Sequence, residues 1–557
     1  MGLSLPKSVI CLRAYSFPKF LSDVIAGLTV GLVALPLAMA FAISSGVPPQ
    51  SGIYCAIIAG FLISALGGSK TQVGGPTGAF VVVVYGIVAK HGIDGLFLCT
   101  MMAGVILIVL GVTGTGTLVK FIPRPVIVGF TNGIAILIAS TQVKDFFGLQ
   151  MEKVPGEFWS RMEALLTHFD TLALAPTLLA ATALVIVVLS KRFVRRIPGS
   201  IIALVLGTCV VAAIGLPVET IGTRFGGIPS GLPSLAVPRF EVQTALTLLS
   251  PALTVAMLGA IESLLSAVVS DRMSGDRHDP NVELVAQGVA NIASPLFGGL
   301  PATGAIARTA TNIRSGATTP VSGMVHALTL LAVLLFAAPL AQYIPLAVLA
   351  AILMVVAYNM GEWDEIPELL KLTWADITVW LVTLLLTLFA DLTLAVEVGI
   401  VLAALLYIRK VTRTTTVEEV TEKDVENGWV HVMEDKLIPH YVSVFRIHGP
   451  FLFGATEKLA VITDQSAALP SIIILRLREM TALDATGLLA LEDLADTLHA
   501  ANRALILCGA QPQPARLMQQ AEFEDKIGKE NVCANIRTAL ERAKELFQSD
   551  QTLQRSA

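Results

Sequence analysis

GGLPATGAIAR, at residues 298–308, is the stretch that decides the fold of this chain. It lies in an apolar region, is rich in small residues, is broken by Pro301 and ends on Arg308. A related stretch, GGPTGA, occupies residues 74–79 and is also flanked by apolar runs. Backbone that breaks a helix at membrane depth is tolerated only where it lines a cavity or is buried in protein. Paired breaks in two halves of a chain mark the central site of a transporter, so we predict two half-helices facing each other across an anion.

The composition indicates a membrane protein. Of 557 residues, 54% are hydrophobic and 14% are charged, and the mean hydropathy is +0.74. A soluble domain carries about 25% charged residues. The net charge of −4 gives no reason to expect a nucleic-acid partner. The six cysteines have no metal-type spacing, so we predict no metal site, no cofactor and no disulfide framework.

Fourteen apolar segments follow one another along the chain. The first seven are about 23–45, one ending near 66, 77–89, 95–113, 121–141, 171–190 and one ending near 216. The second seven are about 248–270, 283–297, 303–314, 318–338, 343–360, 374–390 and 392–408. The segments at 77–89 and 303–314 are too short to cross about 30 Å of hydrocarbon at 1.5 Å per residue. Residues 361–372 mix acidic and apolar side chains and predict an interfacial helix.

The two halves repeat. Gly75 and Gly299 are 224 positions apart, Ile122 and Ile344 are 222 apart, and the Thr-Val pairs at 29–30 and 254–255 are 225 apart. Nearly equal offsets predict an internal duplication of seven segments. Because seven is odd, the second copy is inverted in the membrane. The alternative is that small-residue motifs recur by chance, as in any polytopic protein.

The chain divides into a membrane part and a smaller C-terminal domain. We predict a cytoplasmic N-terminal segment over 1–20, a transmembrane domain over 21–410 with repeats at about 21–216 and 246–410, a linker over 411–436, an α/β domain over 437–550 and a tail over 551–557. Strands at 441–449, 471–477 and 504–510 alternate with helices at 454–468 and 486–503. Lys and Arg gather in loops on one side of the spans, which places both termini in the cytoplasm.

The two broken segments supply the predicted anion site. Helix N-termini concentrate partial positive charge and unpaired N–H groups, so they bind anions. The expected site residues in the first half are Gly75, Pro76, Thr77, Gly78 and Ala79. Those in the second half are Ala302, Thr303, Gly304 and Ala305, with Arg308 one turn later and Phe41 padding the apolar side. The alternative is a pair of kinked structural helices that pack through small residues.

Glu262 lies in the middle of the eighth segment. A carboxylate at that depth is costly and usually marks an ion or proton pathway, so we predict that it carries the coupling proton. Ser263 and Ser266 lie within a turn of it. A structural ion pair with Arg308 and a sodium site built from Glu262, Ser266 and the tenth segment are the alternatives. We interpret Asn132, Gln287, Asn291 and Glu397 mainly as interhelical hydrogen-bonding residues.

With these motifs in place, the chain resembles members of the sulfate permease (SulP) family of anion transporters. The resemblance rests on residues 34–54, 74–80, 257–271 and 298–309, and it covers nearly the whole chain. The C-terminal part resembles a STAS domain (sulfate transporter and anti-sigma-factor antagonist). In its LDATG stretch at 483–487, Asp484 and Thr486 are placed to cap a helix, and Thr486 takes the position of a serine phosphorylated in soluble relatives, which implies a regulatory site.

The resemblance implies a core bundle (segments 1–4 and 8–11) that moves against a gate bundle (5–7 and 12–14) like an elevator, a homodimer, and an anion between segments three and ten. It implies a bacterial inner-membrane symporter, with proton-coupled uptake of a dicarboxylate or sulfate as the leading expectation. Sodium-coupled bicarbonate or sulfate symport and anion exchange are alternatives. Leu37 stands where many animal relatives carry Gln, so their halide selectivity does not transfer. A different class of function is a membrane-anchored signalling scaffold whose STAS domain binds a protein or nucleotide.

Overall fold

The structure is a computed structural model of the chain. It describes residues 5–13, 15–114, 123–151, 154–193, 198–229, 231, 235, 242–390, 392–420, 438–465 and 468–556. Ile122, positions 421–436 of the predicted linker, and the ends of the chain at 1–4 and 557 lie outside these residues. The chain divides into two compact units, Met1–Val401 and Leu402–Ala557, each described here by itself.

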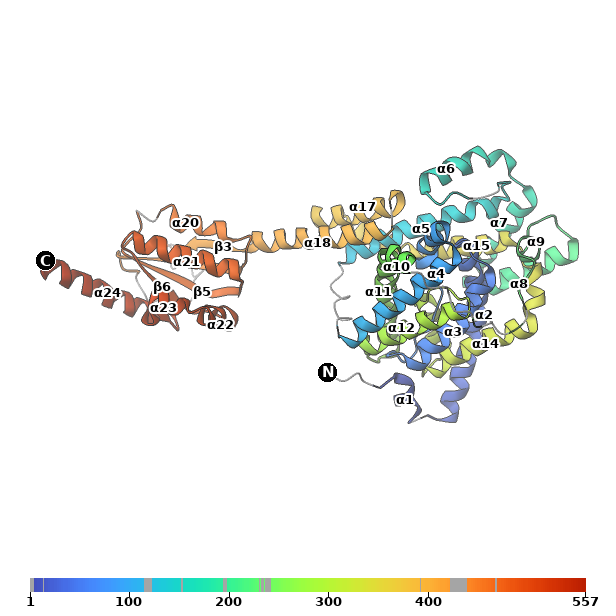
Figure 1. Cartoon of the computed structure of the whole chain (residues 1–557), viewed down its shortest axis with the longest axis horizontal. Helices are drawn as coiled ribbons and strands as arrows, with labels where there is room; N and C mark the ends of the chain where they lie inside the picture. Colours follow the sequence, from blue (N-terminus) through green and yellow to red (C-terminus); the bar gives the residue numbers. More distant parts are fainter. Residues whose placement is uncertain are drawn as a thin grey trace. The chain divides into compact units, whose positions relative to one another are not determined.

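The first unit is helical (Figure 1). Its long helices in the first half are α2 (Phe17–Ser44), α3 (Pro49–Leu66), α4 (Val81–Val112), α5 (Arg124–Phe147), α7 (Leu174–Phe193) and α8 (Gly199–Ile214). Those in the second half are α11 (Leu249–Ser274), α12 (Pro280–Leu296), α13 (Ile306–Arg314), α14 (Val321–Ala337), α15 (Leu346–Met360), α17 (Trp374–Phe389) and α18 (Leu392–Thr414), which belongs to this unit up to Val401. By length and composition, seven helices in the described ranges can cross a membrane.

Helix α4 is two segments joined at a kink. Gly92 has φ 70° and ψ −173°, which a residue with a side chain rarely adopts. Counted at this kink, the described part of the chain holds seven segments in each half. The predicted helical membrane fold is therefore confirmed, and the arrangement is consistent with the seven-plus-seven repeat.

Short helices precede or connect these segments. They are α1 (Lys7–Leu12), α6 (Phe158–Thr167), α9 (Ile221–Phe225), α10 (Val242–Thr247) and α16 (Ile366–Leu369). Helix α16 and the 3-10 turn before it lie where an interfacial helix was predicted. Helices α6 and α9 lie in connections for which the sequence predicted no helix.

The helices pack in two groups that mix both halves of the sequence. In one group α2 contacts α3 and α14, and α4 contacts α11 and α12; in the other, α5 contacts α15 and α17, and α7 contacts α8 and α15. Small residues allow the close approaches, since a Cβ on Gly104 of α4 would lie 2.7 Å from the Gly288 carbonyl of α12. These groups correspond to the predicted core and gate bundles.

The second unit has a five-stranded sheet in the order β3-β4-β5-β6-β7. The strands are β3 (Thr416–Glu419), β4 (Val442–Phe451), β5 (Ile472–Leu483), β6 (Ala504–Cys508) and β7 (Val532–Cys533). Strand β3 is antiparallel to β4, and the other neighbours are parallel. The helices are α20 (Ala460–Thr463), α21 (Ala485–Ala500), α22 (Pro512–Gln520), α23 (Phe523–Ile527) and α24 (Ile536–Ser556). The sheet buries one apolar cluster with the side chains of α21 and a second with those of α24, so the predicted α/β domain is confirmed.

Two local predictions in this unit differ from the structure. The helix predicted over 454–468 is reduced to a 3-10 turn, Thr456–Leu459, and the single helical turn of α20. Strand β3 lies inside the predicted linker, where no strand was expected. Its polar sequence resembles a linker, but hydrogen bonds to the edge of β4 hold it as a strand.

Candidate functional site

The two broken stretches meet in the interior of the first unit. Residues Gly74–Gly75 form β1 and residues Thr303–Gly304 form β2, and these short strands pair antiparallel. Gly75 has φ +144°, and a Cβ there would lie 2.6 Å from Nη1 of Arg308. A glycine is required here because the turn, its partner and the guanidinium approach so closely. Two stretches more than 220 positions apart are thus neighbours in space.

The amides of the second turn are used mostly within the protein. Three of them donate over 2.9–3.1 Å: that of Ala302 to Asn291 Oδ1, that of Gly304 to Ser263 Oγ and that of Ala305 to the Val73 carbonyl. The Thr303 hydroxyl contacts Ser263 Oγ at 2.8 Å and donates to the Gly259 carbonyl at 3.0 Å. Helix α13 begins at Ile306, and amides in the first turn of a helix have no acceptor within it. Within the described ranges, the free amides of this segment are therefore those of residues 306–308, one turn later than the sequence placed them.

The first turn leads directly into its helix. Thr77 precedes a 3-10 turn at Gly78–Phe80, which continues into α4. Thr77 Oγ1 is buried and has no hydrogen-bond partner among the described residues. A Cβ on Gly78 would lie 3.3 Å from the Phe41 ring and 2.7 Å from Met360 Sδ. Phe41 therefore lies against this turn, at a point where α15 also reaches it.

Arg308 joins the two broken segments. Its side chain is 2% exposed, and its Nη2 donates to the carbonyl of Pro76 in the first turn. Its Nε and Nη1 are buried and have no partner in the parts of the chain that the structure describes. A buried cation without a counter-charge is costly unless another anion compensates it.

Glu262 lies apart from Arg308, and no ion pair joins them within the described ranges. Half-buried, Glu262 lines a cavity of about 20 Å³ between α11 and the helices α5 and α18, together with Phe130 and Val396. That volume holds about one water molecule. Ser266 instead contacts the Thr309 hydroxyl of α13 at 3.1 Å. The alternative of a structural Glu262–Arg308 ion pair therefore has no support among the described residues, and Ser266 is bonded to α13 rather than to Glu262.

One face of α12 holds the second turn and the segment that precedes the first. Asn291 forms a reciprocal pair with Ala302, accepting from its amide at 2.9 Å and donating to its carbonyl at 2.8 Å. Ser294 donates to the Leu300 carbonyl at 2.7 Å. Nearer the start of the helix, the buried Glu283 accepts from the amides of Gly68 and Ser69, before the first turn. The sequence predicts mainly interhelical hydrogen bonds for Gln287 and Asn291 of this helix, whereas Asn291 bonds to the second turn. Polar residues every four positions are the sequence signal of this scaffold.

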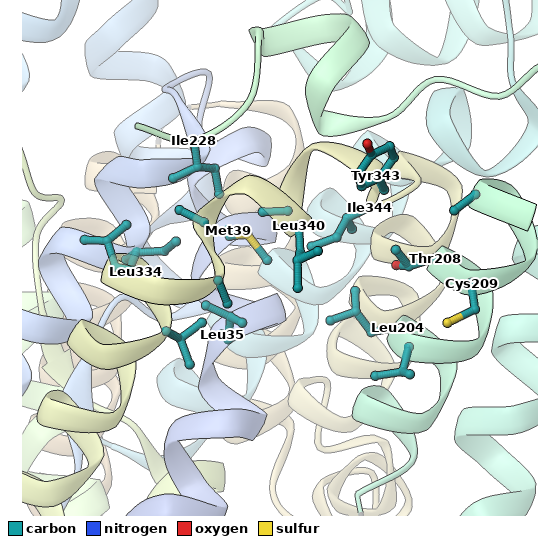
Figure 2. A pocket seen from close by; sticks show the side chains of 17 residues that line it. Leu35, Met39, Leu204, Thr208, Cys209, Ile228, Leu334, Leu340, Tyr343 and Ile344 are labelled. Atoms are coloured by element: carbon teal, nitrogen blue, oxygen red, sulfur yellow. The ribbon is translucent and has the colours of Figure 1, made fainter. Parts of the chain in front are cut away.

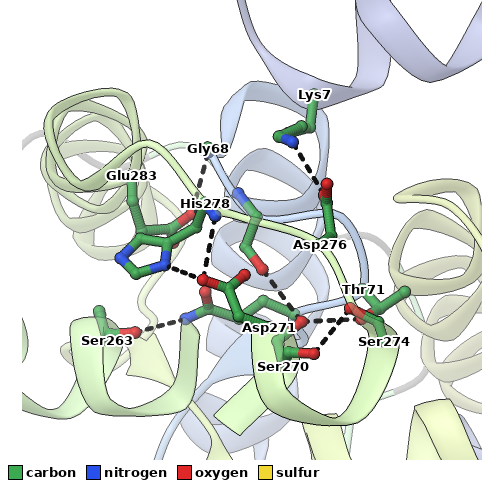
Figure 3. Close-up of polar contacts among 12 residues, drawn as sticks. Lys7, Gly68, Thr71, Ser263, Ser270, Asp271, Ser274, Asp276, His278 and Glu283 are labelled. Atoms are coloured by element: carbon green, nitrogen blue, oxygen red, sulfur yellow. Dashed lines mark hydrogen bonds and ion pairs between the residues drawn. The ribbon is translucent and has the colours of Figure 1, made fainter. Parts of the chain in front are cut away.

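Figure 3 shows a polar cluster at the C-terminal end of α11 and the N-terminal end of α12, where Glu283 lies. Asp271 contacts His278 Nδ1 at 2.7 Å, and Lys7 of α1 donates to Asp276 at 2.8 Å (Figure 3). Burial alone would raise the pKa of the Asp276 carboxyl, but the hydrogen bond from Lys7 and nearby lysine charges lower it below its usual range. These contacts attach the N-terminal helix to the core group.

In the second unit, Asp484 caps α21. Its Oδ1 accepts from the Gly487 amide at 2.7 Å and its Oδ2 from the Phe453 amide at 3.1 Å. Thr486 is exposed in the first turn of this helix. The dipole of the helix favours negative charge at this end.

The comparisons with known proteins agree with this architecture. The model of the sulfate permease family matches residues 20–383, and that of the STAS domain matches residues 435–541. The chain belongs to the sulfate permease family. A member named putative sulfate transporter YvdB, from Bacillus subtilis, is 41% identical over 522 residues, covering 93% of this chain and 97% of that one. The bicarbonate transporter BicA of Picosynechococcus is 30% identical over 546 residues, covering 95% of each chain.

Solved structures give the same fold. The transmembrane domain of a cyanobacterial BicA superposes with a TM-score of 0.61 at 34% identity, over 70% of this chain and 98% of that one. The murine anion transporter Slc26a9, in its inward-facing state, superposes with a TM-score of 0.86 over 97% of this chain and 94% of that one. At 19% identity, this second likeness concerns the fold alone. The protein is therefore a multi-pass membrane transporter of this family and not an enzyme.

Proposed function

We propose that this protein is a secondary active transporter that binds a small oxyanion between the turn at 77–79 and the start of α13. The observation that carries the proposal is Arg308, buried between the two turns. Among the described residues it has no acidic partner, and its nitrogens Nε and Nη1 have no hydrogen-bond partner. The free amides of residues 306–308 and the unpaired Thr77 hydroxyl supply further donors. An anion at this point completes the hydrogen bonding that the protein leaves open.

The anion that we favour is sulfate or bicarbonate, because relatives that match more than nine-tenths of this chain are named for these anions. A dicarboxylate is the third candidate anion, since dicarboxylate and sulfate carriers of this family share the sequence motifs of the site. Purified protein is heated with each anion and with chloride. An anion that binds the folded state raises its melting temperature by mass action, and the largest rise at equal concentration names the preferred class.

We propose that a proton drives uptake and that Glu262 carries it. Glu262 lies where α11 of the core group meets α5 and α18 of the gate group, among apolar side chains. If the core slides against the gate like an elevator, a carboxylate crosses this apolar contact more easily when it is protonated. Ser266 is bonded to α13 rather than to Glu262, so a sodium site made of both residues is the less favoured alternative.

The test is uptake of radiolabelled sulfate into proteoliposomes with and without an inward proton gradient. Each measurement is made once with sodium at a fixed concentration and once without sodium. Glu262→Gln should abolish uphill, proton-driven uptake and keep anion exchange. Glu397→Gln is the matched control, since Glu397 is an exposed acid on α18. Unaltered uphill uptake by Glu262→Gln would exclude the role, and uptake that needs sodium at fixed pH would favour the alternative.

We also propose that the chain works as a homodimer in a bacterial inner membrane, with both termini in the cytoplasm and Thr486 exposed there to a kinase or other protein. A signalling scaffold with an inert membrane part is the competing class. Deleting residues 430–557 separates the two ideas. If the protein is a transporter, the membrane part still binds the anion specifically after the deletion. If it is a scaffold, the membrane part shows no specific anion binding before or after the deletion.

A further inference from the structure

A second cavity lies away from the anion site, between helices of the two groups. It has a volume of about 450 Å³ and is bounded by α2, α3 and α14 on one side and by α8 on the other. Figure 2 shows Leu35, Met39 and Leu334 across from Leu204, Thr208 and Cys209. The walls are almost entirely hydrocarbon. Among the side chains that line it, the Thr208 hydroxyl is buried and has no hydrogen-bond partner within the described ranges.

The surroundings of this cavity decide what fills it. Its rim includes side chains that are largely exposed in the isolated chain, Val205 at 52% and Leu340 at 65%. The adjoining outer surface of α8 is also apolar and exposed, at Leu206 and Val210. In a chain that spans a membrane, this surface faces lipid, so the cavity opens onto acyl chains.

Leaving this cavity empty or filling it with water is energetically unfavourable. Protein interiors are packed to crystal-like density, and an empty space of this size forfeits contacts on every wall. Water requires two to four polar partners, which these walls do not offer. An acyl chain is apolar, flexible and present at the opening in excess.

We infer that this cavity is a binding site for one acyl chain of a membrane phospholipid, held between the core group and α8. The acyl chain contacts both helix groups. It therefore lies in an interface whose packing changes if the two groups slide as proposed above. The binding itself does not depend on the anion site or on coupling.

The test is photocrosslinking with a phospholipid that carries a diazirine at the end of one acyl chain. The full-length protein is reconstituted with it, irradiated and mapped by tandem mass spectrometry. We expect crosslinks on both walls, at Met39 and Leu334 as well as on the Thr208 side of α8. Crosslinks confined to the outer positions Leu206 and Val210 would show contact with bulk lipid only and would overturn the inference.

Matched variants make the result specific. Thr208→Trp fills the cavity and should remove at least nine-tenths of the crosslinks at Met39 and Leu334. Leu206→Trp places the same side chain on the outer face of α8 and should leave them unchanged. Thermal unfolding of both variants verifies folding; if Thr208→Trp unfolds, Leu35→Phe replaces it as the filling variant. Equal labelling in filled and control variants contradicts the site, whereas loss of anion transport alone bears only on the proposed function.

Discussion

Replacing Arg308 by methionine tests the assumption on which the anion site depends most, that the Arg308 guanidinium donates hydrogen bonds to the anion. Methionine keeps the length and the apolar stem of the side chain and removes the charge and every N–H donor. Among the described residues, the guanidinium has one acceptor, the Pro76 carbonyl, and two nitrogens, Nε and Nη1, without one. The change therefore removes the donors that the account assigns to the anion and costs the protein one internal hydrogen bond.

The magnitude follows from this inventory. A hydrogen bond to a charged group contributes about 1.5–3 kcal/mol. Because about 1.4 kcal/mol corresponds to a tenfold change in affinity, loss of a single such bond raises the Kd for sulfate about 10- to 150-fold. The unliganded protein should be affected much less. The unpaired Pro76 carbonyl destabilises it, but the removal of an uncompensated buried charge stabilises it.

The assay is equilibrium binding of radiolabelled sulfate to purified protein, with the melting temperature of the unliganded protein as a measure of folding. Arg314→Met is the matched control, because Arg314 lies on the same helix and is exposed. We expect weaker binding in the first variant and wild-type binding in the second. Wild-type affinity in a folded Arg308→Met protein would refute the reasoning.

Two further predictions concern the backbone of the site. Gly75→Ala should weaken binding about 5- to 150-fold, because its backbone conformation costs an L-residue about 1–3 kcal/mol and its Cβ would lie 2.6 Å from Arg308. Gly86→Ala, with open space around it, should bind normally. Equal affinities of the two variants would contradict this. Asn291→Ala should lower the free energy of unfolding by about 1–3 kcal/mol for each group of Ala302 left unpaired, measured by chemical denaturation in detergent. An unchanged free energy would show that Asn291 does not hold the second turn.

The architecture was predictable because it depends on patterns that the chain carries along its length. The number of helices follows from the apolar segments, two of which are short and broken. Their pairing follows from the repeat, in which Gly75 and Gly299 are 224 positions apart. The strand at 416–419 was not predictable, because its polar side chains fit an exposed linker equally well. Only the edge of β4, reached through a long sequence separation, makes it a strand.

The candidate site could be predicted in outline but not in its hydrogen bonding. Glycine and proline reveal where a helix breaks, but they do not show which amides remain free. That depends on Asn291 and Ser263, side chains from two other helices that take the amides of residues 302 and 304. Likewise, the sequence places Glu262 and Arg308 at similar depth, but only packing directs one toward α5 and α18 and the other toward Pro76.

The most direct test is to locate the anion itself. Crystals of the protein grown with selenate, measured at the selenium edge, give an anomalous peak at the bound anion. We expect one peak between the turn at 77–79 and the start of α13, within hydrogen-bonding distance of Arg308. A peak elsewhere in the membrane part, with none between these two turns at saturating selenate, would contradict it.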